Sequence, residues 1–115
     1  MRIRATVAMT TVVLCAAISV PAYAAGKFTL YGLGNASCGK WLAEAGDPNG
    51  MFFNSMLSWV LGFTSAAGYY DVRGVLRETD SAAISAWVDK YCRQHTDDHL
   101  QDAAKYHVLE LSEPK

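Results

Sequence analysis

Beyond its first 24 residues, this 115-residue chain is poor in the features that usually point to a function. It has no basic stripe, which argues against nucleic acid as a partner. It has no internal repeat, no coiled-coil heptad and no low-complexity tract. Its motifs assemble no catalytic triad, phosphate-binding loop or metal cage, so nothing favours an enzyme or a cofactor. The remaining length, residues 25–115, is enough for one small domain.

Residues 1–24 have the three parts of a cleaved export signal. Arg2 and Arg4 begin it, an apolar run covers residues 5–20, and small residues at 22 and 24 form the exit. The run is too short, and too rich in alanine and threonine, to anchor the mature chain in a membrane. Cys15 lies inside the run and is expected to leave with it.

Removal of that segment leaves Cys38 and Cys92 as the only cysteines. An exported chain with two cysteines most simply forms one disulfide, in an oxidising compartment such as the bacterial periplasm. Closing this loop stabilises the fold by at most about 4 kcal/mol in the chain-entropy model. We therefore expect a structural disulfide and not a cysteine nucleophile.

Four helices are predicted, which gives an all-α fold: a small orthogonal four-helix bundle over residues 37–112, after an extended arm and turn at 25–36. Ser37 is expected to cap the first helix, Thr79 or Asp80 the third, and Thr96 the fourth. The second helix is expected over about 52–70. It is apolar around much of its circumference, which is typical of a central or interface helix. Its glycines, Gly62 and Gly68, suggest close packing or a bend.

The expected buried faces follow the helical period. On the second helix the face begins at Phe52 and continues through Met56, Val60 and Phe63. The third and fourth helices have complete apolar faces: Ile84, Trp87, Val88, Tyr91 and Cys92 on the third, and Leu100, Ala103, Ala104, His107 or Val108, and Leu111 on the fourth.

His95 and His99 lie four residues apart with Asp98 and Asp102 nearby, a grouping that suggests metal or a small metal-dependent hydrolase. The expected cap at Thr96 falls between the two histidines, so they should not share one helical face. A solvated, capped helix start explains the same residues, and we predict no metal site.

Large aromatic side chains are numerous for a domain of this size. One small core accounts for most of them, and the remainder predicts a surface for self-association or for a client protein. The candidates for that surface are Trp41, Trp59 and Phe63.

Three segments carry a family resemblance. Residues 37–43 (SCGKWLA), 60–63 (VLGF) and 84–94 (ISAWVDKYCRQ) resemble the helices of HdeA/HdeB-type periplasmic acid-stress chaperones, and the resemblance covers most of residues 37–111. It implies a homodimer at neutral pH that acid loosens, so that apolar rings bind unfolded clients. A second resemblance, to Rap/Tai-type periplasmic immunity proteins, rests on Gly62-Phe63 and on residues 93–96. It implies a protein that binds and neutralises a secreted cell-wall-degrading toxin.

Overall fold

The computed structural model describes residues 29–114, so the expected export signal and most of the arm lie outside the described residues. The regular structure within 29–114 is helical and confirms the expected all-α fold of four α-helices. The elements are a 3-10 helix η1 (Gly32–Asn35), α1 (Cys38–Glu44), α2 (Met51–Tyr69), α3 (Ser81–Gln94) and α4 (Leu100–Ser112).

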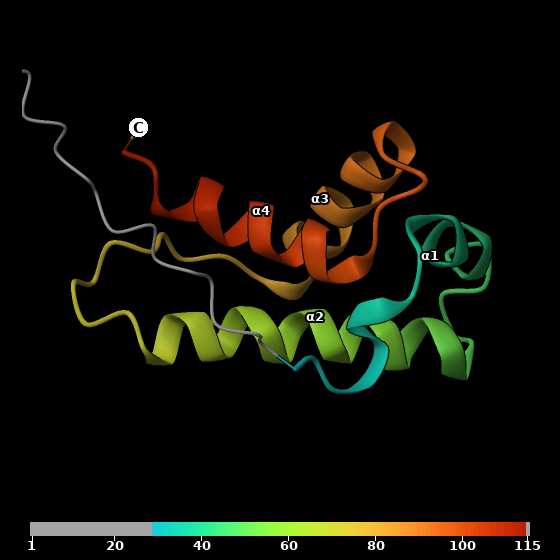
Figure 1. The fold of residues 1–115 in the computed structure, drawn as a ribbon, viewed down its shortest axis with the longest axis horizontal. Helices are drawn as coiled ribbons and strands as arrows, with labels where there is room; N and C mark the ends of the chain where they lie inside the picture. Colours follow the sequence, from blue (N-terminus) through green and yellow to red (C-terminus); the bar gives the residue numbers. More distant parts are fainter. Residues whose placement is uncertain (1–28, 115) are drawn as a thin grey trace, which may run out of the picture.

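Helix α2 is the central element of the bundle. In Figure 1 it runs along the bottom of the view. The 3-10 helix η1 crosses in front of it, and α4 and α3 lie above it. It packs against α1, α3, α4 and η1, which agrees with its apolar circumference. Its buried side chains are Phe53, Met56, Val60 and Thr64. Met56 and Val60 are buried as expected, but Phe53 and Thr64 are buried in place of Phe52 and Phe63, and Phe52 is 56% exposed. When a helix is apolar on nearly every side, the spacing of its apolar residues does not determine which side faces the core.

Two of the predicted helix caps are present. The Ser37 hydroxyl accepts a hydrogen bond from the Lys40 amide at 3.0 Å, and an Asp80 carboxylate oxygen accepts one from the Ala83 amide at 2.8 Å. Both side chains satisfy backbone donors that a helix start leaves free. These two helices therefore begin at the residues that the sequence predicts.

The expected cap at Thr96 is wrong. Helix α4 begins at Leu100 after His99, whose amide donates to the Asp102 carboxylate at 3.2 Å. The loop before α4 is hydrogen-bonded to the start of α1. The amides of Cys38 and Gly39 donate to the carbonyls of Asp98 and Thr96 at 2.7 and 3.2 Å. This tertiary use of the loop carbonyls holds residues 96–99 out of the helix.

The disulfide between Cys38 and Cys92 is present, with Cα atoms 4.8 Å apart. Both cysteines are fully buried and join the start of α1 to the last turn of α3. Trp41 lies in the same core, with its ring centroid 4.9 Å from that of Phe53. The bond is thus part of the core, as expected of a structural disulfide.

Glycine makes a close contact at Gly34. A Cβ atom added there would lie 2.3 Å from Cζ2 of Trp59, so η1 can lie on α2 only through a glycine at this position. At Gly62 and Gly68, by contrast, an added Cβ would meet no described atom within 4 Å beyond the helix's own backbone. Close packing at these two glycines was therefore a wrong expectation.

Candidate functional site

A repeated contact between an aromatic donor and a carboxylate connects α3 to its neighbours. In each case an indole N–H or a phenol O–H donates to an aspartate or glutamate oxygen at 2.5 Å. Such bonds to an ionised acceptor are shorter and stronger than neutral ones. The pairs are Trp41 with Asp89, Trp87 with Glu110, and Tyr91 with Asp98.

The Tyr91 hydroxyl is held in its donating form. Burial raises the pKa of Tyr91, and the hydrogen bond to the Asp98 carboxylate raises it further. The phenol therefore stays protonated wherever the protein is folded and donates its proton to Asp98.

His107 lies on α4 at the junction with α3, where it is only 4% exposed. Its ring centroid is 4.9 Å from that of Trp87, and neither ring nitrogen has a hydrogen-bond partner among the described residues. Burial lowers the pKa of His107; the nearby Glu110 carboxylate opposes this shift, and the Arg77 guanidinium adds to it. The native protein thus holds a neutral imidazole at this junction.

The outer side of the same junction is hollowed into an aromatic groove of about 810 Å³. Rings from α3 form one wall, side chains of α4 and of the residue that follows it form the other, and Asp98 closes one end. We call this feature the aromatic groove; its lining is Trp87, Tyr91, His95, Asp98, Tyr106, Leu109, Glu110 and Glu113.

The rings of the groove pack on one another. Trp87 and Tyr91 stack with centroids 5.4 Å apart and planes within 13°, and Tyr91 stacks on Tyr106 at 5.8 Å. His95 lies at the end of the row, 4.4 Å from the Tyr91 centroid. Because Trp87 and Tyr91 are also fixed by carboxylates, the groove has a preformed aromatic wall.

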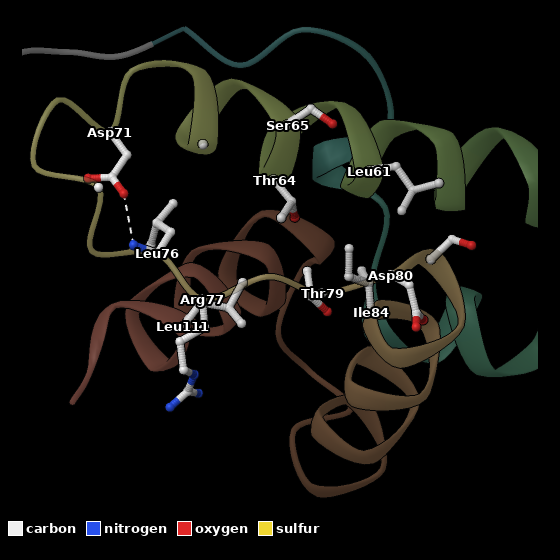
Figure 2. Close-up of a pocket in the computed structure, with 13 residues that line it drawn as sticks. Leu61, Thr64, Ser65, Asp71, Leu76, Arg77, Thr79, Asp80, Ile84 and Leu111 are labelled. Atoms are coloured by element: carbon white, nitrogen blue, oxygen red, sulfur yellow. Dashed lines mark hydrogen bonds between the residues drawn. The ribbon is translucent and has the colours of Figure 1, made fainter. Parts of the chain in front are cut away.

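A second cavity, of about 580 Å³, lies between the last turns of α2 and the linker to α3 (Figure 2). Its charged groups are used by the fold. Asp71 accepts from the Leu76 amide at 2.8 Å, and Asp80 caps α3. The Arg77 guanidinium points to the end of α4, where it donates to the carbonyls of Glu110 and Glu113 at 3.0 and 3.3 Å. The charged groups around this cavity therefore stabilise the fold and are not free to bind a ligand.

Of the three candidates for a client or self-association surface, two are partly exposed and one is buried. Trp59 and Phe63 stack on α2 with centroids 5.6 Å apart and are both half-buried. The Trp59 indole donates to the Tyr31 carbonyl at 2.7 Å, so the start of the described chain covers part of it. Trp41 does not belong to this surface: it is fully buried, because α1 turns it inward against Phe53 and Asp89.

His95 and His99 do not point to a common site. His95 ends α3 and His99 precedes α4, and each has its own aspartate: Asp98 at 4.0 Å from His95 and Asp102 at 3.8 Å from His99. Among residues 29–114, no group of three His, Cys, Asp or Glu side chains is placed to hold a metal ion. None of the helices formed by these residues has the length and apolar character needed to cross a bilayer.

Sequence reasoning missed the aromatic groove, although a signal for it exists. Trp87, Tyr91 and His95 are spaced four residues apart, which places three rings on one stripe of a helix. The helical period predicts Trp87 and Tyr91 as core residues, whereas both are half-buried and line the groove.

Comparison of the chain with protein-family models, with curated proteins and with solved structures finds no match.

Proposed function

We propose that this protein is a non-enzymatic, acid-responsive binding protein of the HdeA-like kind, exported to the periplasm, that receives unfolded proteins on apolar surface when acid loosens its helices. One observation carries this proposal: each of the aromatic–carboxylate bonds around α3 has an acceptor that acid neutralises. Hydrogen bonds between neutral groups are roughly half as strong as bonds to an ionised acceptor, so protonation of these acceptors would weaken each bond.

The buried histidine acts in the same direction. In the native state His107 is neutral and has no described acceptor that could stabilise its charged form directly. A proton on its ring would place a positive charge beside Trp87, at the junction that the Trp87–Glu110 bond holds. We therefore expect acid to weaken the contact of α3 with α4 in two ways, which are coupled because Glu110 lies near His107.

The described chain also carries apolar surface that a client could use. Tyr69 and Tyr70 pack edge to face at the end of α2, and Val72 in the following turn is 96% exposed. At the other end of α2, Met51 is 83% exposed and Phe52 lies beside it. Loosening α4 would add the core faces of α2 and α3, while the disulfide keeps α1 attached to α3.

The test uses the mature, oxidised protein and a client that aggregates in acid. Light scattering at pH 2.5 should fall when the protein is added in equimolar amount, and the protein should have no effect at pH 7. Absence of suppression at pH 2.5 would contradict the proposal. Size-exclusion at both pH values tests the implied homodimer and its dissociation.

A matched pair of variants connects the activity to the carboxylates. The triple variant Asp89→Asn, Asp98→Asn and Glu110→Gln imitates the protonated groups, so it should open and suppress aggregation at a higher pH than wild type. Glu78→Gln, which changes an exposed carboxylate of the linker, is the control and should behave as wild type. Equal onset in all three proteins would show that these bonds do not govern opening.

A second candidate is an immunity-type protein that blocks a secreted cell-wall-degrading toxin. The preformed aromatic groove favours it, because a rigid surface available at neutral pH suits tight binding of one folded partner. Co-purification with the product of a neighbouring toxin gene at pH 7 would support this candidate against the first.

A further inference from the structure

We propose that the aromatic groove between α3 and α4 is a binding site for an arginine side chain carried by an extended segment of a partner protein. The inference concerns the folded protein at neutral pH. It goes beyond the proposed response to acid and does not depend on it.

The aromatic wall provides the first half of the recognition. Cations are attracted to the faces of tryptophan and tyrosine rings, and the groove presents Trp87, Tyr91 and Tyr106. The structure already contains one such contact at the rim, where Lys105 Nζ lies 4.8 Å from the Tyr106 centroid. Tyr106, which is 48% exposed, is therefore the ring of this wall that a cation reaches, while Trp87 and Tyr91 stack behind it.

The charges of the groove provide the second half. Among the described residues that line it are three carboxylates, Asp98, Glu110 and Glu113, and neither a lysine nor an arginine. Asp98 and Glu110 each use one oxygen to hold a ring, which leaves each a second oxygen. A ligand that combines a flat cationic group with paired donors matches this arrangement, and the arginine guanidinium is that group.

The groove distinguishes arginine from lysine by geometry and not by charge. The Arg77 guanidinium donates to the carbonyls of Glu110 and Glu113, Lys90 lines a neighbouring pocket, and Lys105 lies over Tyr106. These cations repel a bound ammonium and a bound guanidinium alike. The guanidinium compensates better, because it can stack on a ring and bond two carboxylate oxygens at once.

The length of the groove suits a chain segment. Trp87 lies seven residues before Gln94, the last residue of α3, which corresponds to about 10 Å along the helix, and His95 follows directly. An extended chain of three to four residues spans about that distance. Leu109, which is 51% exposed on the opposite wall, offers contact to an apolar residue next to the arginine.

The experiment is a binding titration at pH 7 and low salt with the oxidised, mature protein. The probe is the fluorescein-labelled peptide acetyl-Leu-Arg-Leu-Arg-Leu-amide. Two matched peptides replace both arginines by lysine or by citrulline, which keeps the shape and removes the charge. We expect the arginine peptide to bind, the lysine peptide to bind at least 3-fold more weakly and the citrulline peptide at least 10-fold more weakly, with loss of binding in 0.5 M salt.

Variants then locate the site. Glu113→Gln and Tyr106→Leu change exposed positions of the groove and should each weaken arginine-peptide binding at least 5-fold with an unchanged circular dichroism spectrum. Glu78→Gln and Tyr70→Leu make the same chemical changes at exposed positions outside the groove and should leave binding unchanged.

Three results would overturn the inference: equal binding of the arginine and citrulline peptides, equal effects of the groove and control variants, or no binding of the arginine peptide. A soluble uncharged disaccharide fragment, di-N-acetylchitobiose, serves as the neutral competitor, because stacked rings with carboxylates also suit sugars. Displacement of the peptide by that fragment, or its binding in place of the peptide, would likewise reject the arginine site. None of these measurements involves acid, so their failure leaves the proposed acid response to its own test.

Discussion

The indole nitrogen of Trp41 donates to Oδ1 of Asp89 at 2.5 Å, and this bond joins α1 to α3 beside the disulfide that joins the same two helices. Trp41 is fully buried, so its N–H has no access to water. The carboxylate thus satisfies a donor that the core would otherwise leave without a partner.

Replacing Asp89 by leucine should therefore lower the free energy of unfolding at pH 7 by about 1–3 kcal/mol, because the buried indole N–H loses its acceptor. Asp89→Asn keeps an acceptor at the same place and should cost less. Arg93→Gln is the control for the weak ion pair of Arg93 with Asp89 at 4.0 Å, and should change stability by less than about 0.5 kcal/mol. Urea unfolding measures all three. Equal losses in the leucine and asparagine variants would show that the hydrogen bond is unimportant.

His107 should make stability depend on pH above the carboxylate range. Burial lowers its pKa in the folded protein, so below the ordinary histidine value of about 6.5 the unfolded chain binds a proton that the native state does not. The contribution of His107 to the free energy of unfolding is therefore complete above that pH. It falls as the pH drops toward the native pKa, by up to about 1.4 kcal/mol per pH unit.

His107→Leu removes this dependence, and urea unfolding at pH 7.5 and pH 5.0 should show a smaller difference than in wild type. His99→Gln, an exposed histidine before α4, should keep the wild-type difference. An unchanged pH dependence in His107→Leu would assign the effect to other groups.

Substitution of Gly34 and of Gly62 by alanine should change the free energy of unfolding in opposite directions. Gly34→Ala places a methyl group 2.3 Å from the Trp59 ring, so η1 must move away, and we expect a loss of about 1–3 kcal/mol. Gly62→Ala adds its methyl group in open space inside α2 and should stabilise by up to about 1 kcal/mol through helix propensity. Thermal unfolding at one pH compares them, and a loss in Gly62→Ala would indicate that this position needs glycine for another reason.

The disulfide should contribute much of the stability of a domain this small. Reduction opens a loop with a sequence separation of 54, for which the chain-entropy model gives about 4 kcal/mol as an upper limit. Urea unfolding with and without a reductant, at equal pH, measures the difference. A loss below about 1 kcal/mol would mean that the core around Trp41 holds α1 without the bond.

Features set by neighbouring residues could be predicted from the sequence. The Asp80 cap, the buried face of α4 and the pairing of Cys38 with Cys92 all follow from local period, local hydrogen bonding or a count of two cysteines. The Thr96 cap could not, because the carbonyls of that loop bond to α1, which is distant in the sequence. Phe52 was assigned to the core because α2 is apolar on nearly every side.

The candidate site depends still more on tertiary structure. The acceptor of Trp41 lies 48 residues away and that of Trp87 lies 23 residues away, and no local pattern pairs them. The inward direction of Trp41 likewise follows from how α1 docks. The spacing of rings on α3 predicts part of the groove. Its carboxylates come from α4 and from the residues on either side of α4, and they meet the rings only when the two helices are side by side.

The bond between Cys38 and Cys92 also closes a covalent ring, which leaves a segment of the described chain outside it at each end. Helices α1 and α2 and all but the last two residues of α3 lie within the ring, η1 precedes it, and α4 follows it as the carboxyl-terminal tail. The ring cannot be extended by pulling on the carboxyl end of the chain, whereas the tail can be peeled away from α2 and α3 without breaking a covalent bond. His107 and Glu110 both belong to the tail. Mechanical or chemical opening of this fold should therefore be graded, with the tail released while the ring retains its length and its crosslink.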